Sequence, residues 1–141
     1  MTTAEKIKII VEATINAPVE KVWNYWNALE HITKWCTATP EWHTPRAEND
    51  LKVGGKFLTR MKVKDGSFGF DFGGVYNEVK TNELIAYTMD DGRQTKITFS
   101  KVADGIKVEE TFDAETVNPL EMQKGGWQAI LDNFKKYTEA N

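Results

Sequence analysis

The residues best suited to chemistry in this 141-residue chain are two histidines and one cysteine, which lie close together. His31 and His43 are the only histidines, and they flank Cys36, the only cysteine. A Cys/His pair can supply a nucleophile and its base, but the pattern indicates no carboxylate that would orient the base. We therefore favour a structural cysteine in the core or a loop. One cysteine and two histidines also fall short of a zinc ligand set, so neither a metal site nor a cofactor is predicted.

Glu110 is the carboxylate that the strand pattern directs toward the interior. Alternate residues of a strand share a face, and Glu110 shares one with Val108 and Phe112. A carboxylate among apolar side chains has a raised pKa and could bind or protonate a ligand. The alternative is a bulge between Glu109 and Glu110 that returns both side chains to solvent. No catalytic residue is predicted beyond Glu110 as a single candidate.

Composition and charge limit the classes of protein that remain. A net charge of −3 argues against a nucleic-acid binder, which would carry a basic excess. The first residues contain no apolar signal segment, and the aliphatic run at 9–11 is far shorter than the ~20 residues that cross a bilayer. A lone cysteine suits a reducing compartment. We expect one cytoplasmic domain spanning residues 1–141, with no membrane span and no nucleic-acid partner.

The elements that position these residues begin with a strand and two helices. Residues 7–15 are rich in β-branched side chains and predict a strand. Pro18 fits the first position of a helix, whose apolar face follows a helical period at Val19, Val22, Trp23 and Trp26. A second short helix is predicted over 28–35. The segment from Pro40 to Gly55 is predicted to be irregular, because it contains Pro45 as well.

The rest of the chain predicts an antiparallel meander and a long helix. Asp-Gly pairs at 65–66, 91–92 and 104–105 are strong hairpin signals. Asn118 is predicted to cap the last helix, with Pro119 at its first position and Glu121 reaching back to the cap. Apolar residues then keep a helical period for about five turns. The fold class is therefore α+β. The predicted strands are 55–64, 68–80, 84–90, 94–102 and 105–115.

The order of elements and several motifs resemble the START-like, or helix-grip, superfamily (SRPBCC), which includes the birch-pollen allergen. Within it the chain is similar to the AHSA-type family, named for the C-terminal domain of the activator of the heat-shock-protein-90 ATPase. The residues that carry the resemblance are 17–23 (Ala-Pro-Val-Glu-Lys-Val-Trp), Trp35, 51–57 (Leu-Lys-Val-Gly-Gly-Lys-Phe), 74–79 (Gly-Val-Tyr-Asn-Glu-Val) and Gly126-Trp127. Residues 80–83 depart from the pattern, since relatives often have a proline there.

The resemblance implies a curved antiparallel sheet of about six strands, two short helices after the first strand, and a long C-terminal helix packed across the sheet. It also implies a cavity between sheet and helix. Gly125-Gly126 is either a place where the helix is thinned to admit a ligand or a place of tight packing. The candidate cavity residues, for which ordinary core is the alternative, are Trp26, Trp42, Phe57, Thr59, Met61, Phe70, Phe72, Phe99, Gly126, Trp127, Ile130 and Leu131.

Three functions follow from these observations. The first is binding of a small hydrophobic molecule in the cavity. The second is a co-chaperone-like interaction with the 90-kDa heat-shock chaperone in a stress response, against which the length of the chain weighs. The third is a cyclase or hydrolase that uses Glu110, which ranks last because no second catalytic group converges on it. We expect a monomer or a weak homodimer.

Overall fold

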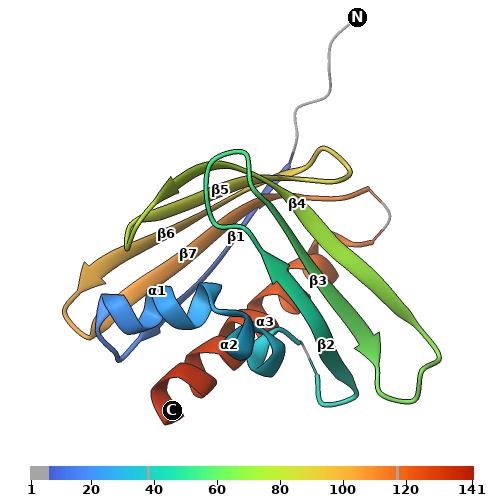
Figure 1. Ribbon diagram of the computed structural model, residues 1–141, viewed down its shortest axis with the longest axis horizontal. Helices are drawn as coiled ribbons and strands as arrows, with labels where there is room; N and C mark the ends of the chain where they lie inside the picture. Colours follow the sequence, from blue (N-terminus) through green and yellow to red (C-terminus); the bar gives the residue numbers. More distant parts are fainter. Residues whose placement is uncertain (1–6, 38, 117) are drawn as a thin grey trace, which may run out of the picture.

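The chain folds into an arched sheet that covers a long helix. The computed structural model describes residues 7–37, 39–116 and 118–141, and in them seven strands form one antiparallel sheet accompanied by three helices (Figure 1). The strands follow the order β1-β7-β6-β5-β4-β3-β2 across the sheet. The elements are β1 (Lys8–Ile15), α1 (Val19–Asn27), α2 (Leu29–Trp35), β2 (Trp42–Asn49), β3 (Lys56–Val63), β4 (Gly69–Lys80), β5 (Leu84–Met89), β6 (Gln94–Val102), β7 (Gly105–Asp113) and α3 (Leu120–Ala140).

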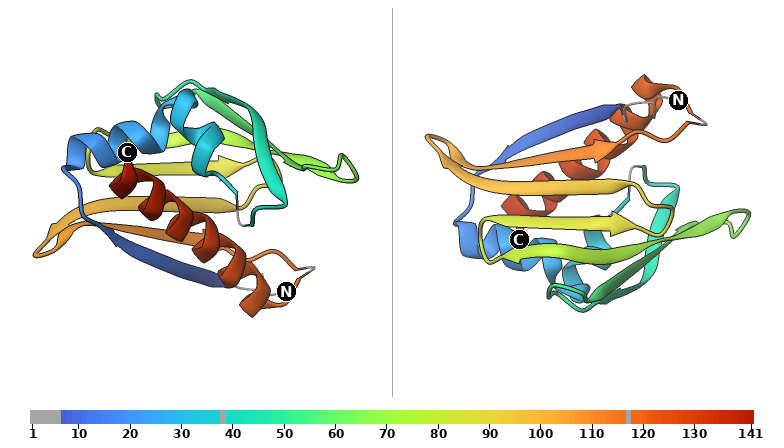
Figure 2. Two further views of the ribbon diagram at one scale, coloured as in Figure 1. Left: turned by 90° about the horizontal axis from the view of Figure 1, so that it is seen from below. Right: turned by 90° about the horizontal axis from the view of Figure 1, so that it is seen from above.

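All three helices lie on the concave face of the sheet, as the two views of Figure 2 show. Helix α3 crosses this face, and α1 and α2 lie beside it. The core is where α3 meets the strands: Leu131, Phe134 and Phe112 are fully buried there. The helix-grip arrangement that the resemblance implied is confirmed.

Strand β2 corrects the prediction of an irregular segment after Pro40. This strand pairs with β3 at one edge of the sheet, and its register shifts between His43 and Arg46. Pro45 lies within that shift, where a missing N–H breaks no regular ladder bond, and an edge strand tolerates proline for the same reason. The sheet therefore has seven strands instead of about six.

The predicted cap of the last helix is wrong. Helix α3 begins after Pro119, and its N-terminus has no side-chain capping hydrogen bond. The buried amide of Gln123 stabilises the preceding turn instead, since its Oε1 accepts from the backbone N–H of Glu115 at 2.8 Å and its Nε2 donates to the carbonyl of Asn118 at 2.8 Å. A side chain one turn into the helix thus organises the loop that Asn118 was expected to organise.

Side chains of α3 also bind the free edge of β1. Gln128 Nε2 donates to the carbonyl of Glu12 at 3.0 Å, and Lys135 Nζ donates to the carbonyl of Thr14 at 2.8 Å. The carboxylate of Glu139 accepts from the backbone N–H of Asn16 at 2.8 Å. Strand β1 pairs with β7 alone, so these bonds fix α3 along the open edge of the sheet.

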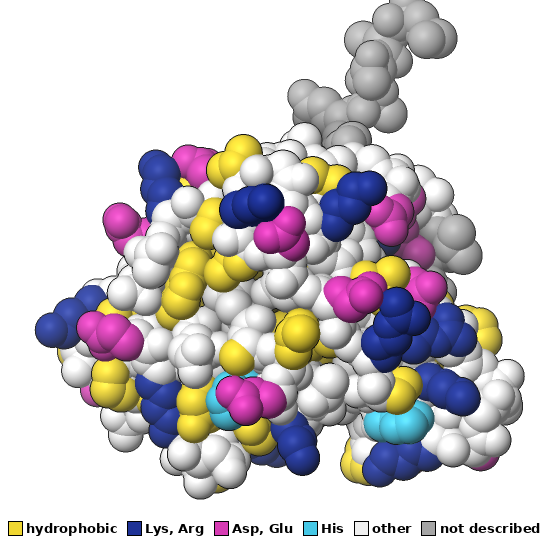
Figure 3. Space-filling model, viewed as in Figure 1, with side chains coloured by type: hydrophobic (Ala, Val, Ile, Leu, Met, Phe, Trp, Pro, Cys, Tyr) yellow, Lys and Arg dark blue, Asp and Glu magenta, His cyan; other side chains and the backbone are white. Residues whose placement is uncertain are grey.

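The surface carries charges of both signs. On the face in Figure 3, lysines and arginines are interspersed with acidic side chains over most of the surface, and several basic side chains gather at the lower right. Among the described residues, no helix is both long and apolar enough to span a bilayer.

Candidate functional site

A cavity of about 680 Å³ lies between the concave face of the sheet and α3. Its volume falls within the range of small-molecule sites, roughly 300–1,000 Å³. The wall consists mainly of apolar and aromatic side chains from the middle strands, from α1 and α2, and from the first half of α3. The aromatic lining residues are Trp26, Trp35, Trp42, Phe57, Phe70, Phe72, Tyr76, Tyr87 and Trp127.

Most of the residues predicted from strand parity and helical period face this space. All but Phe99 and Leu131 line the cavity: Trp26, Trp42, Phe57, Thr59, Met61, Phe70, Phe72, Gly126, Trp127 and Ile130. Phe99 lies on the expected face of β6, but that part of the face is covered by α1, and the ring packs edge-on to Trp23 at 5.2 Å. Leu131 is fully buried in the core. The alternation of residues along the strands identified the concave face of the sheet, but it could not show which part of that face a helix covers.

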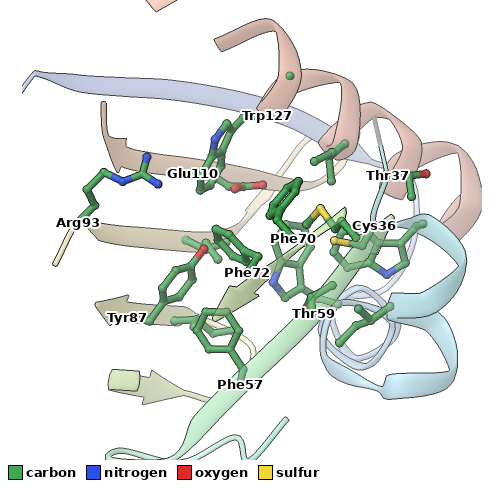
Figure 4. A pocket seen from close by; sticks show the side chains of 18 of the residues that line it. Cys36, Thr37, Phe57, Thr59, Phe70, Phe72, Tyr87, Arg93, Glu110 and Trp127 are labelled. Carbon is green, nitrogen blue, oxygen red and sulfur yellow. The ribbon is translucent and has the colours of Figure 1, made fainter. Parts of the chain in front are cut away.

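The aromatic rings hold one another in place around the cavity (Figure 4). Trp127 of α3 stacks on Phe112 of β7 with 3.8 Å between ring centroids, and it meets Phe72 edge-on at 6.0 Å. On the opposite wall Phe57 contacts Tyr87 at 4.6 Å. Rings from several elements therefore support each other as a preformed apolar wall.

Exposed apolar residues mark where the cavity opens to solvent. Met122 near the start of α3 is 62% exposed and Phe70 on β4 is 39% exposed, although both line the cavity. Trp42 packs edge-on to Phe70 at 5.8 Å and to Phe68 at 5.9 Å. The cavity is therefore open to solvent beside the beginning of α3 and beside Phe70 on β4.

The two glycines of α3 face open space. A Cβ atom placed on Gly125 or Gly126 would meet no atom within 4 Å outside the adjacent helix backbone. Tight packing, one of the two interpretations of this pair, is therefore absent. Gly126 lines the cavity, whereas Gly125 is exposed. Gly126 therefore leaves α3 without a side chain beside the cavity. Each glycine costs roughly 1 kcal/mol relative to alanine inside a helix, so the missing side chain lowers the stability of the helix.

Glu110 points into the cavity. Strand β7 pairs in regular register on both sides, with Glu110 opposite Val11 of β1 and opposite Ile97 of β6, so the alternative of a bulge is excluded. The residue is 5% exposed and lines the cavity, with its carboxyl directed inward near Trp127 (Figure 4). Burial raises the pKa of this carboxyl from 4.5 to about 8. In the described part of the chain, no group hydrogen-bonds to it.

The other titratable groups near Glu110 also favour their protonated forms. Burial, and secondarily the charge of Glu110, raises the pKa of the Cys36 thiol to about 12. The same two causes raise the pKa of the Tyr87 hydroxyl well above its usual value. A thiol of this kind is a poor nucleophile, because the thiolate is the reactive form.

His31 belongs to a junction of helices. Its Nδ1 lies 2.7 Å from the hydroxyl of Tyr137, and its ring stacks on Tyr25 with 3.8 Å between centroids. These contacts make His31 part of the packing of α1, α2 and α3. In residues 7–37, 39–116 and 118–141, no three His, Cys, Asp or Glu side chains come together as a metal site.

Some lining residues were missed from the sequence. Ile85 and Tyr87 share a face of β5, and Tyr76 continues the wall on β4. The alternation within 84–90 could have identified Ile85 and Tyr87. Cys36 lines the cavity as well, although its place after α2 gave no signal for this.

Comparisons with known proteins agree with this fold. Residues 16–139 match the family model "Activator of Hsp90 ATPase homolog 1-like protein". The solution structure of an AHSA1-like protein from Aeromonas hydrophila is 46% identical over 95% of this chain and 93% of that one, with a TM-score of 0.89. Chr148 from Cytophaga hutchinsonii is 57% identical over 96% and 93%, with a TM-score of 0.79. A search of curated proteins found no significant match. Because the family model covers most of its length, the chain belongs to the AHSA1-like family of the helix-grip superfamily.

Proposed function

We propose that the chain binds a small hydrophobic ligand in the cavity between the sheet and α3. The observation that supports this is the cavity of about 680 Å³ with its wall of aromatic rings. Burial of about 200 Å² of apolar ligand surface there would contribute roughly 5 kcal/mol. Because the rings already pack against one another, little further ordering is needed when a ligand enters.

The test combines a ligand screen with a matched pair of variants. Trp26, Trp35 and Trp127 line the cavity, so a ligand that enters will change the tryptophan fluorescence. Native mass spectrometry of freshly purified protein, followed by extraction, will identify a molecule that co-purifies. Gly126→Leu should abolish binding, because its side chain projects into the cavity.

Gly125→Leu is the control for this variant. It removes the neighbouring helical glycine and adds the same side chain, but at an exposed position outside the cavity. This variant should bind as the wild type does, and circular dichroism should show that both variants fold. Unchanged affinity in Gly126→Leu, or no response to a broad panel of lipophiles, would contradict the proposal.

A second candidate is a co-chaperone-like interaction, which the exposed rings of Phe68, just before β4, and Phe70, within it, favour. Phe68 is 59% exposed and packs against Trp42 in a cluster that could contact a protein partner. The family name makes the 90-kDa heat-shock chaperone the partner to test. Phe68→Ser should weaken binding to the purified chaperone in calorimetry, whereas Val53→Ser, which changes a 65% exposed residue elsewhere, should not. Equal effects of the two variants would argue against this surface.

A further inference from the structure

We propose that the ligand of this cavity is a hydrophobic amine, whose protonated nitrogen binds the carboxyl of Glu110. This inference rests on the proposed function and assigns the polar group of its ligand. It begins from Glu110, a buried carboxyl in the cavity lining to which no described residue hydrogen-bonds.

Glu110 is unusual for a buried polar group. Only 5% of it is exposed, yet within the described residues nothing hydrogen-bonds to its carboxyl. The great majority of buried polar side chains have a hydrogen-bond partner, and a specific exception calls for an explanation. Strand pairing holds Glu110 inward from both sides. A ligand that donates a hydrogen bond would supply the missing partner.

The charges that line the cavity favour a cation over an anion. The lining contains three carboxyls, on Glu48, Glu110 and Glu115, and one guanidinium, on Arg93. That guanidinium is already paired, since its Nε lies 2.7 Å from the carboxylate of Asp91. An anionic ligand group beside Glu110 would therefore meet a carboxyl and a guanidinium that Asp91 already partly neutralises, whereas an ammonium group would meet a carboxyl to which no described residue hydrogen-bonds.

The rings around Glu110 favour an ammonium group over a neutral donor. Phe112 shares the inward face of β7 with Glu110, and Trp127 stacks on Phe112 at 3.8 Å. Trp127 and Phe72 line the same cavity as Glu110, and Figure 4 shows them turned toward the same space as its carboxyl. The face of an aromatic ring attracts a cation, most strongly when the cation is desolvated. An alcohol would gain only the hydrogen bond, whereas an ammonium would gain a charge-assisted hydrogen bond and the attraction of the rings.

The proton balance permits this pairing in an apolar cavity. An amine that enters uncharged accepts the proton of the Glu110 carboxyl, and its N–H then donates back to the carboxylate. No net charge is transferred from water, so the desolvation cost is lower than for an isolated ion. Among the described residues, Cys36 and Tyr87 interact electrostatically with Glu110, and both retain their protons.

Two probes of equal shape test the proposal. 1-Naphthylmethylamine and 1-naphthylmethanol differ only in the amine and the hydroxyl, and their affinities can be compared by calorimetry at pH 7. The wild type should bind the amine at least about tenfold more tightly than the alcohol, the difference expected for a charge-assisted hydrogen bond. Glu110→Gln keeps the shape and hydrogen-bonding capacity but carries no charge, so the preference should fall below about twofold.

Glu109→Gln is the matched control, because Glu109 lies next to Glu110 on the outer face and pairs with Lys107. This variant should keep the full preference for the amine. Retained binding of the alcohol by Glu110→Gln will show that its cavity is intact. Equal affinity of the wild type for both probes, or a preference that survives in Glu110→Gln, would overturn the amine proposal and leave ligand binding itself supported. Failure of both probes to bind would count against both proposals.

Discussion

Replacement of Glu110 by glutamine should change how the stability of the protein depends on pH. The folded protein holds the Glu110 proton up to about pH 8, whereas the unfolded chain releases it near 4.5. Between these values the native state binds more protons than the unfolded state, so the free energy of unfolding falls as pH rises. The contribution is fully present below about pH 4.5 and is lost as pH rises through about 8.

The size of the effect follows from the pKa difference. Each pKa unit corresponds to about 1.4 kcal/mol, so a shift from 4.5 to about 8 amounts to up to roughly 5 kcal/mol. About 3 kcal/mol of this is already lost at pH 7. Glutamine has a similar shape and stays neutral. Glu110→Gln and the wild type should therefore have similar stabilities at pH 5, and the variant should be more stable by several kcal/mol at pH 9.

Urea unfolding followed by tryptophan fluorescence, repeated at each pH from 5 to 9, measures this difference directly. Glu109→Gln is the control, because the side chain of Glu109 is 34% exposed and lies 3.3 Å from Lys107. Partly exposed pairs contribute about 1 kcal/mol or less, so this variant should stay within that range of the wild type at every pH. A stability difference between wild type and Glu110→Gln that does not change with pH would refute the reasoning.

Three further results are expected. Leu131→Ala should lower the free energy of unfolding by about 2–5 kcal/mol, because it empties a fully buried site. Ligand affinity should survive, since Leu131 lies outside the cavity. A loss of stability below about 1 kcal/mol would contradict the role of Leu131 in the core. Cys36, which is partly buried in the cavity wall, should react with iodoacetamide at pH 8 far more slowly than free cysteine, because its thiol pKa is about 12. A rate equal to that of free cysteine would contradict the raised pKa of this thiol. Asp113→Ala should destabilise the fold by about 3 kcal/mol in urea unfolding, because the buried carboxylate of Asp113 accepts from Lys8 and from the backbone N–H of Gln94. Unchanged stability there would show that neither bond matters.

The strands of the meander could be predicted because local rules determine them. The Asp-Gly pairs place a glycine where the turn requires a positive φ, as at Gly66 (82°) and Gly92 (91°). Alternation within β7 then directs Glu110 inward, and regular pairing with both neighbours keeps it there. These features depend on residues close in sequence, so the predicted and observed strands agree closely.

Features that depend on distant contacts could not be predicted in this way. Phe99 has the same strand parity as a cavity residue, but only the position of α1 decides that Trp23 covers it. Strand β2 forms because β3 lies beside it, despite the local signal of Pro45. The loop before α3 is held by Gln123 from within the helix, a contact that no capping motif describes. In each case tertiary packing overrides the local preference.

The bonds from α3 to β1 have a consequence for self-association. An edge strand offers unpaired N–H and C=O groups on which another chain can add a strand, and this is a common route to aggregation. Here Gln128, Lys135 and Glu139 bind three of these groups, the carbonyls of Glu12 and Thr14 and the N–H of Asn16, so an incoming strand would have to displace three hydrogen bonds to the helix. At the opposite edge, the register shift at Pro45 interrupts the row on β2. Helix α3, which lines the cavity, thus also hinders the addition of strands from other chains at the β1 edge of the sheet.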